Sequence, residues 1–512
     1  MMKKILSKNK ISIIFSFSIL LSQKNYNVDY SVIAKFREEG FQRSEISSTL
    51  SYMTDVLGAR LTNSEDMRRA QDWAAKEMKR IGLKNVNKEP FMDYGYSWDN
   101  LFFSLHLLEP DYQPMVGYPI AHTPGTDGKK QLSVVLADIK TKDDLLKYKG
   151  LLKGKAVLAS PLVAINMDRY NKGVSRYSED ELTIIQNNSL PKKKRINTRI
   201  VNPNIISSEE RNIFFKKEGA EIILESRSGW IGAVRGFARP GAKKDIWDRK
   251  GTLEHLPIVA VTPEHYNRMV RLTKRDIPVR IEVDIKTKVG QKRREAINIL
   301  GEIPGTDLKD EIVMIGAHYD TWHASPNASD NTSGVAVMLE AMRIIAFSKI
   351  KPRRTIRIAL WSGEEQGIHG SREYVHKHFG NPNDPKVGKK RKYEKLSGYF
   401  NQDYGPGQYR GIYLQDNEHV REIFTSWMKP FNDLGMTVIS GQGVGSTDHI
   451  AFDRAGLPGF QFLQDKTGGT GGHTNLDYFE TIPIEDLKKN AVIIASFAFH
   501  TAMLDNVLPR KK

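Results

Sequence analysis

From about residue 294 onward, short apolar segments alternate with segments whose apolar residues recur at helical spacing. Segments of the first kind predict strands, at 297–303, 311–320, 355–361, 412–415, 436–440 and 458–463. Segments of the second kind predict helices, over about 332–347, 366–378, 418–434 and 484–504. Such alternation is typical of a mostly parallel sheet covered by helices on both faces. The sequence therefore predicts an α/β fold, in which functional groups gather beyond the carboxyl ends of the strands.

The preceding part of the chain has other patterns. Residues 28–90 read as helical, most clearly from Met67 to Ile81, and Gly82 follows as a stop signal. Strand-like runs then dominate a mixed region from about 92 to 290, at 132–139, 155–160, 221–226, 257–262 and 279–285. This change of pattern predicts a strand-rich region between two parts of the α/β unit.

The first residues resemble an export signal. The basic segment 1–10 precedes the apolar run Ile11–Ser22, whose 12 residues fit the roughly 7–15 of a signal-peptide core. The run is shorter than the ~18–20 apolar residues that span a bilayer, although a buried strand or an uncleaved anchor is the alternative. We expect residues 1–24 to be a signal peptide and the protein to be secreted or periplasmic. We expect no membrane-spanning segment in the rest of the chain.

Composition limits the chemistry of any site. The chain has no cysteine, which excludes thiol nucleophiles, thiolate zinc fingers and iron–sulfur clusters, so any metal must be held by His and carboxylates. The formal net charge is +17, from 77 Lys and Arg against 60 Asp and Glu, which favours contact with acidic surfaces. The lysine-rich stretch 191–195 contains no aromatic residue or glycine, and 386–395 contains only one of each, which is not the repeated interleaving that marks a nucleic-acid surface. We interpret them as solvated loops and expect no nucleic-acid partner.

Polar clusters follow the predicted strands or lie in glycine-rich segments. They contain His318 with Asp320, Asp330, the pair Glu364–Glu365, Asp403 and His473. Singly, each signal is weak, because a His-x-Asp is more often a loop hydrogen bonder and a Glu-Glu pair is more often surface charge. Their coincidence at several strand ends favours one functional rim.

The chemistry of this set indicates a metal site. Buried carboxylates gathered on one rim repel each other and shift toward neutral unless a cation compensates them. Two His with several carboxylates and no sulfur suit zinc in a catalytic site. Asp320 is close enough to His318 either to orient the neighbouring loop or to accept the second ring proton of a liganding His. Because adjacent side chains alternate in direction, one of Glu364 and Glu365 can bind metal while the other moves a proton.

Several longer motifs resemble the co-catalytic di-zinc family of aminopeptidases and glutamate carboxypeptidases. They are GAHYDT, SDNTSGVAVMLE, LWSGEEQGIHGSREYV, NQDYGPG and GGHTNLDYF. The resemblance is strongest to the plasma glutamate carboxypeptidase branch, and it covers about 30–110 and 292–508 well and the region between them only loosely. The resemblance implies a zinc exopeptidase fold with an inserted, β-rich, protease-associated domain. We expect residues 25–115 to form the N-terminal part of the peptidase domain, 116–291 the insert and 292–512 the main catalytic domain.

The resemblance also implies residue roles and two zinc ions per chain. One zinc is held by His318 with Asp403 and the other by Glu365 with His473, while Asp330 bridges both. The peptide bond between Asp330 and Asn331 is expected to be cis. The catalytic residues are Glu364, as general base, and Asp320, as support for His318. The segment Thr447–His449 is similar to a family loop near the substrate, so His449 is a candidate substrate contact.

The leading functional hypothesis is a zinc-dependent exopeptidase acting on dipeptides or short peptides with a free N-terminus, through a metal-bridging water and a Glu general base. One alternative is a single-zinc aminoacyl cyclisation enzyme similar to glutaminyl cyclases. Another is a receptor-like binding protein on the same fold, which the intact set of polar residues argues against. A homodimer is expected only by analogy with the family.

Overall fold

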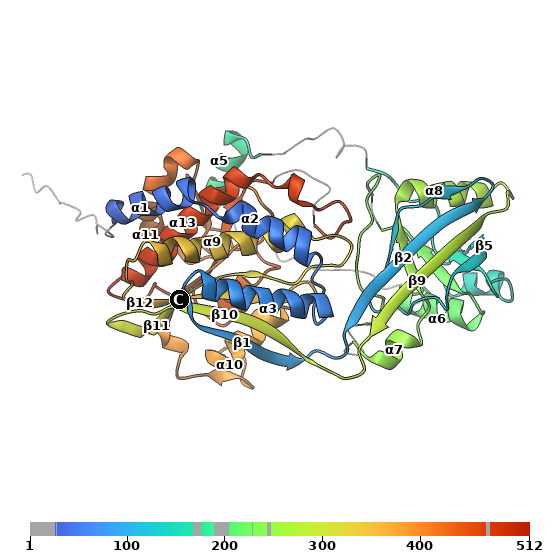
Figure 1. The fold of residues 1–512 in the computed structure, drawn as a ribbon, viewed down its shortest axis with the longest axis horizontal. Coiled ribbons are helices and arrows are strands. Elements are labelled where there is room, and N and C mark those ends of the chain that lie inside the picture. Colours follow the sequence, from blue (N-terminus) through green and yellow to red (C-terminus); the bar gives the residue numbers. More distant parts are fainter. Residues whose placement is uncertain are drawn as a thin grey trace, which may run out of the picture.

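The computed structural model describes residues 26, 28–166, 176–188, 204–227, 229–242, 247–466 and 472–511. These residues form two lobes, each built on an eight-stranded sheet (Figure 1). We call the part around the sheet that contains β11 the large lobe, and the part around the sheet that contains β9 the small lobe. The predicted signal peptide and the lysine-rich stretch 191–195 lie outside the described residues.

The large-lobe sheet is mixed, with four parallel strands at its centre. In spatial order its strands are β1 (Lys84–Asp93), β10 (Glu295–Ile303), β12 (Arg354–Trp361), β11 (Leu308–His318), β15 (Leu396–Asn401), β18 (Gly459–Gln464), β16 (Tyr409–Tyr413) and β17 (Val438–Ser440). Pairing is parallel from β12 through β11 and β15 to β18, and antiparallel between β1, β10 and β12. The expected α/β fold with a mostly parallel mixed sheet is confirmed.

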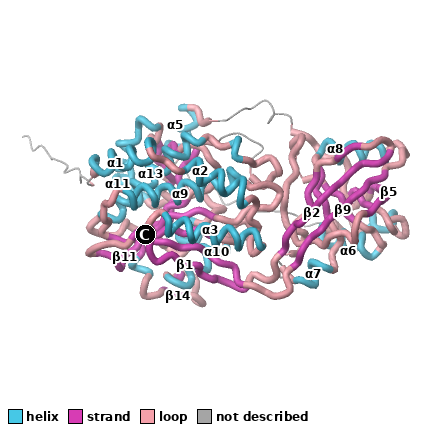
Figure 2. Tube along the Cα trace, in the orientation of Figure 1, coloured by secondary structure: helices cyan, strands magenta, loops and turns pink. Residues whose placement is uncertain are grey.

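Helices cover both faces of this sheet (Figure 2). They are α1 (Tyr30–Gln42), α2 (Ile46–Ser51), α3 (Glu65–Arg80), α9 (Ser333–Phe347), α10 (His369–His378), α11 (Arg421–Met428), α12 (His449–Arg454) and α13 (Ile484–Met503). Strand β11 shows how the faces are divided, because successive side chains of a strand point to opposite sides. Val313 and Ile315 pack in the core that includes α9 and α13, whereas Met314 packs in the core that includes α10 and α12.

The small-lobe sheet runs from Trp98 to Val289. In spatial order its strands are β3 (Gln113–Pro114), β2 (Trp98–Glu109), β9 (Arg280–Val289), β5 (Lys130–Leu136), β6 (Ala156–Leu158), β7 (Ile222–Glu225), β8 (Ile258–Val261) and β4 (Gly117–Pro119). Its helices are α6 (Ser208–Lys217), α7 (Arg249–Leu253) and α8 (Pro263–Thr273). The long pair β2–β9 joins the two lobes in Figure 1. Because β2 and β3 precede residue 115 and belong to the small-lobe sheet, the expected domain boundary at residue 115/116 falls inside this sheet.

Two further segments depart from simple expectations. Residues 84–90 belong to the region that was expected to be helical, but they lie in β1, an edge strand paired antiparallel with β10. Helix α5 (Glu179–Asn187) lies in the small-lobe part of the sequence, yet it packs on the large lobe, where Leu182 contacts Val438 and Leu463 (Figure 1). A two-stranded ribbon of β13 (Gly380–Asn381) and β14 (Gly388–Lys389) carries part of the second lysine-rich stretch. Among the described residues, no helix has both the length and the apolar character required to cross a bilayer.

Candidate metal centre

The parallel strands align the predicted site residues at one edge of the large-lobe sheet. His318 is the last residue of β11 and lies opposite Trp361, the last residue of β12. The loop after Trp361 carries Glu364 and Glu365, and the loop after β15 carries Asp403. Because these strands are parallel, their carboxyl ends deliver all of these side chains to the same rim.

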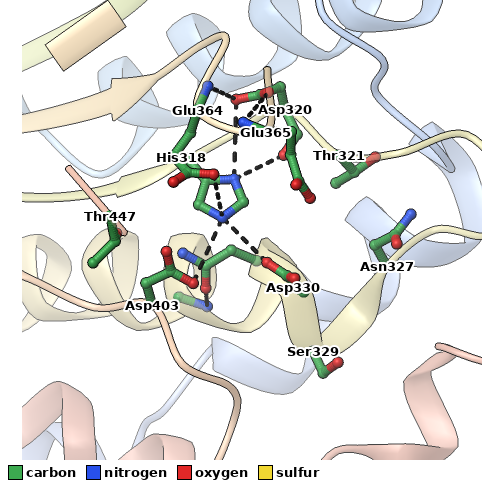
Figure 3. Close-up of polar contacts among 12 residues, drawn as sticks. His318, Asp320, Thr321, Asn327, Ser329, Asp330, Glu364, Glu365, Asp403 and Thr447 are labelled. Carbon is green, nitrogen blue, oxygen red and sulfur yellow. Dashed lines mark hydrogen bonds and ion pairs between the residues drawn. The ribbon is translucent and has the colours of Figure 1, made fainter. Parts of the chain in front are cut away.

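Five of the predicted ligands, with Glu364, form two adjoining groups at this rim. One group is His318, Glu364 and Asp403, and the other is Asp330, Glu365 and His473, with the ligand atoms of each group within 4.8 Å of one another. The Asp330 carboxylate lies between them. Its Oδ1 is 3.2 Å from Nε2 of His318 (Figure 3), and its Oδ2 is 3.1 Å from Nε2 of His473. Each imidazole also faces a second carboxylate, Asp403 for His318 at 3.7 Å and Glu365 for His473 at 2.8 Å.

The hydrogen bonds of His318 leave a ring nitrogen directed at this cluster. Its Nδ1 lies 2.9 Å from the backbone carbonyl oxygen of Asp320, an acceptor, so Nδ1 carries the proton and donates it there. In a neutral imidazole the buried Nε2 then has a lone pair, and it makes no hydrogen bond within the described residues. A lone pair facing carboxylate oxygens is unfavourable unless a proton or a metal ion lies between them, and imidazole nitrogen with carboxylate oxygen is a donor set that zinc accepts. The residues present therefore fit a metal.

The Asp320 side chain holds the loop that carries the two glutamates. It is fully buried, and its Oδ1 and Oδ2 accept hydrogen bonds from the backbone N–H groups of Glu364 (3.2 Å) and Glu365 (3.3 Å), with Thr62 Oγ1 donating to Oδ2 (2.9 Å). Its carboxylate remains 3.9 Å from Nδ1 of His318. The sequence left two roles open for Asp320, orienting the loop or accepting the ring proton of His318. In the structure the Asp320 side chain orients the loop, and its backbone carbonyl accepts the ring proton.

A second buried carboxylate fixes the segment around Asp330. Asp477 accepts hydrogen bonds from the backbone N–H and the hydroxyl of Ser329, at 2.8 and 2.7 Å. The peptide bond from Asp330 to Asn331 is cis, as expected, and Nδ2 of Asn331 donates to the backbone carbonyl of Gln402 (2.8 Å). Sequence reasoning missed Asp477 as a site residue, although it lies within the quoted motif GGHTNLDYF.

Burial and mutual charge set the pKa values of the centre. Burial lowers the pKa of His473, but Glu365 and Asp330 outweigh it and raise this pKa to about 10. For His318, burial is likewise outweighed, by Asp403 and Asp330, and the pKa lies well above its usual value. Burial and the charge of Asp330 raise the pKa of Glu365 to about 7. Without cations, the imidazoles of this centre therefore retain protons at the positions that face the carboxylates.

Two cavities meet at the centre. The first, of about 690 Å³, is lined by every member of the two groups except His318, together with Tyr404, Ile368 and Lys466. The second, of about 590 Å³, shares Glu365 and His473 with the first and is otherwise lined mainly by the small lobe. Their shared residues place the rim between two spaces of the size that ligand sites occupy.

His449 lies behind the wall of the first cavity. It begins α12 and is fully buried, with Nε2 2.7 Å from Nε2 of Gln415 and 3.1 Å from the carbonyl oxygen of Val444. Burial lowers its pKa to about 4, and the neighbouring Ser446, rather than His449, lines the cavity. The structure therefore does not bring His449 to the surface where the sequence predicted a substrate contact.

A mixed α/β sheet with two His–carboxylate groups at the carboxyl ends of its parallel strands defines the class of zinc exopeptidase folds. Comparison with known proteins narrows the class: residues 298–498 match the sequence model of peptidase family M28. Carboxypeptidase Q is 22% identical to this chain in Homo sapiens and 23% in Bos taurus, over 94% of this chain and 89% of each relative. The family resemblance predicted from the sequence is confirmed.

Solved structures share the fold across both lobes. The peptidase M28 precursor from Shewanella amazonensis has a TM-score of 0.63 at 21% identity, covering 94% of this chain and 98% of its own. The zinc aminopeptidase BSAP from Bacillus subtilis has a TM-score of 0.53 at 19% identity, covering 91% and 97%. Because these alignments span almost the whole chain, the similarity in fold extends over residues of both lobes.

Proposed function

We propose that this chain is a zinc-dependent exopeptidase that hydrolyses dipeptides or short peptides with a free N-terminus and binds two zinc ions. The observation that carries the proposal is the placement of Asp330 between two imidazoles, each of which faces a further carboxylate. His318 and Asp403 would hold one ion and Glu365 and His473 the other, with Asp330 shared. The zinc aminopeptidase among the structural neighbours and the carboxypeptidase Q relatives support this assignment.

Zinc bound in such a site lowers the pKa of water and polarises a carbonyl oxygen. Glu364 supplies the proton transfer. Both glutamates line the first cavity, but Glu365 contacts His473 at 2.8 Å, whereas Glu364 stays 4.0 Å from Nε2 of His318. The backbone N–H of Glu364 is fixed by Asp320, which directs the carboxylate toward the cleft. From there Glu364 takes a proton from the attacking water and returns it to the departing amine, as a general base and then a general acid.

The carboxylate oxygens of the first cavity support a free N-terminus in the substrate. Its lining includes the carboxylates of Asp330, Glu364, Glu365 and Asp403. Two divalent ions would balance these four negative charges, but a substrate ammonium group can still donate several hydrogen bonds to carboxylate oxygens, whereas an acetylated N-terminus has one N–H and no charge. We therefore expect hydrolysis of free peptides to exceed hydrolysis of the N-acetylated forms.

Metal stoichiometry and chelation test the proposal. Purified protein should contain two zinc ions by mass spectrometry, and a chelator should abolish dipeptide hydrolysis until zinc is added back. One zinc per chain together with cyclisation of N-terminal glutamine would favour the cyclase alternative. Protein that takes up zinc and binds peptides without turnover would favour a receptor-like role.

The Glu364→Gln variant tests the base assignment. It keeps the shape of the side chain and leaves the ligands untouched, so zinc content should be unchanged while turnover falls at least about 100-fold. A variant that retained more than about a tenth of the wild-type rate would show that another group moves the proton. The partly exposed Glu373 on α10 provides a matched control, Glu373→Gln, with expected wild-type turnover.

Export and homodimerisation stay predictions. The export signal was predicted from residues 1–24, which lie outside the described part of the chain. Mass spectrometry of the mature protein would locate a cleavage site, and sedimentation analysis would give the number of chains in the assembly.

A further inference from the structure

The loop that carries His473 lies between the two lobes. On its large-lobe side, the hydroxyl of Ser325 donates to the backbone carbonyl of Thr474 (2.6 Å). On its other side, the loop pairs in an antiparallel bridge with a segment that lies between β7 and β8 in the sequence. We call residues 473–475 the ligand loop and residues 232–237 the docking segment. One ligand of the metal centre therefore belongs to a loop that both lobes contact.

The docking segment is anchored in the small lobe at both ends. Near its start, the backbone N–H of Gly232 donates to the carboxylate of Glu264 on α8 (3.1 Å), and Val234 packs in the core formed by β6, β7 and β8. At its end, the backbone carbonyl of Phe237 accepts the N–H of Ala121 (2.9 Å). Because the segment is part of the small lobe, its contact with the ligand loop depends on how the two lobes pack.

Four hydrogen bonds join the docking segment to the ligand loop. Gly236 donates its backbone N–H to the carbonyl of His473 itself (3.0 Å), and the backbone N–H of Asn475 donates to the carbonyl of Val234 (3.0 Å). The Asn475 side chain adds two more bonds, because Oδ1 accepts the backbone N–H of Val234 (2.6 Å) and Nδ2 donates to the carbonyl of Gly232 (3.1 Å). Asn475 therefore ties the ligand loop to the small lobe through both of its side-chain polar atoms.

The backbone of His473 requires such support. Its φ is 67°, in the left-handed region that residues with a Cβ rarely adopt, and such a conformation persists only where surrounding contacts hold it. On the small-lobe side, these contacts are the hydrogen bond from Gly236 and the ring of Phe237, which meets the imidazole edge to face at 5.5 Å. His318 differs, because it ends β11 and its Nδ1 donates to Asp320 of the same lobe. The two imidazoles of the centre therefore have supports in different lobes.

We propose that Asn475 is a positioning residue through which the small lobe completes the zinc site formed by Glu365 and His473. The proposal rests on the two-zinc centre proposed above and adds a difference between its two sites. Residues of the large lobe build and support the His318 site, whereas the His473 site is complete only with the docking segment in place. The coupling is reciprocal, because an ion that binds the docked arrangement more tightly also stabilises that arrangement. Zinc at His473 therefore strengthens the contact between the lobes.

Removing the Asn475 side chain tests its role in metal binding. In Asn475→Ala the two side-chain hydrogen bonds are lost, whereas the backbone bonds from Gly236 and from residue 475 remain. Titration with zinc against a competing chelator should show one ion bound with wild-type affinity and a second bound about 10- to 100-fold more weakly, as expected when a group that supports a metal ligand is removed.

Asn267→Ala is a matched control within the small lobe. The side chain of Asn267, on α8, likewise spans a backbone N–H and a backbone carbonyl, both of Val163, at 2.8 and 2.9 Å. Neither residue lines the two cavities that meet at the metal centre. This variant should lose comparable stability and still bind both zinc ions with wild-type affinity.

Hydrogen exchange in the full-length wild-type protein measures the reciprocal effect and requires no variant to fold. Zinc should slow exchange of the backbone N–H groups of Val234, Gly236 and Asn475 at least about fivefold, because each of them is bonded across the contact between the lobes. The N–H groups of β8, inside the small-lobe sheet, should exchange at the same rate with and without zinc.

The possible outcomes are distinct. Two zinc ions bound by Asn475→Ala as tightly as by the wild type would refute the positioning role, even where chelator-sensitive hydrolysis upholds the proposed peptidase. Exchange at the docking segment that zinc does not change would refute the coupling between the lobes and the metal. Equal weakening of zinc binding in Asn267→Ala would overturn the assignment to Asn475, since general destabilisation of the small lobe would then suffice. Protein that binds no zinc would refute the proposed function and this inference together.

Discussion

Replacing Asp320 with Asn tests whether this carboxylate acts on the base-carrying loop rather than on the metal. In the structure its two oxygens accept the backbone N–H groups of Glu364 and Glu365. An Asn side chain has the same shape but offers only one acceptor oxygen, so in either orientation its amide nitrogen faces a backbone N–H donor. His318 should be unaffected, because its Nδ1 donates to the backbone carbonyl of residue 320.

The size of the effect follows from the bond that is lost. A hydrogen bond to a charged group contributes about 1.5–3 kcal/mol, and each ~1.4 kcal/mol corresponds to a factor of about ten in rate. If the loop holds Glu364 in place for proton transfer, kcat should fall about 10- to 150-fold. Zinc content should remain that of the wild type.

The assay is dipeptide hydrolysis at saturating zinc, with metal content measured on the same sample. Asp307→Asn is a suitable control, because this aspartate is exposed and pairs with Arg353 at the surface. A kcat for Asp320→Asn within about threefold of wild type would refute the positioning role. Loss of zinc in parallel with activity would instead assign the aspartate to ligand support.

Two more predictions concern the metal centre itself. In Gly472→Ala the new Cβ would lie 2.9 Å from Cβ of Asp330 and press against its carboxylate, so zinc affinity should fall about 10- to 100-fold by competitive titration. Gly445→Ala, where the added Cβ meets no atom within 4 Å, should bind zinc normally. Because the pKa of His473 is raised to about 10, zinc must displace its proton at neutral pH. Zinc affinity should therefore rise with pH from about 6 to about 8, and titration heats should depend on the ionisation enthalpy of the buffer; heats independent of the buffer would contradict these protonation states.

The large-lobe core could be predicted because its signals are local. The central strands are buried on both faces and read as continuous apolar runs, and the Ser333–Phe347 helix follows from its spacing and length. Strand β1 carries no such signal. It is an edge strand in which Glu89 alone is buried, so its sequence does not alternate, and its pairing with β10 is a long-range contact.

The ligand set could be predicted for a related reason. Each ligand follows a recognisable strand or lies in a glycine-rich turn, and the rule that parallel strands end on one rim converts sequence positions into proximity. Residues from the other lobe obey no such rule. Phe237 reaches His473 because the small lobe folds against the large one, and no local pattern around residue 237 indicates this contact. His449 illustrates the opposite error, since a motif beside the cleft does not determine which of its side chains faces the cavity.

The pKa directions at the centre have a common origin, which connects folding of the site to its chemistry. Burial, and then neighbouring carboxylates including Asp403, raise the pKa of Glu364 well above its usual range, which without cations favours the protonated form that cannot act as a base. Divalent ions reverse the raised pKa values of both the imidazoles and the carboxylates, because a bound cation favours neutral imidazoles and charged carboxylates around it. The centre is then electrostatically balanced only when ligands, ions and base are assembled together. Since Asp320 holds the loop of Glu364 from beneath, through backbone groups rather than through the ligands, the position of the base is set by the fold and its charge by the metal.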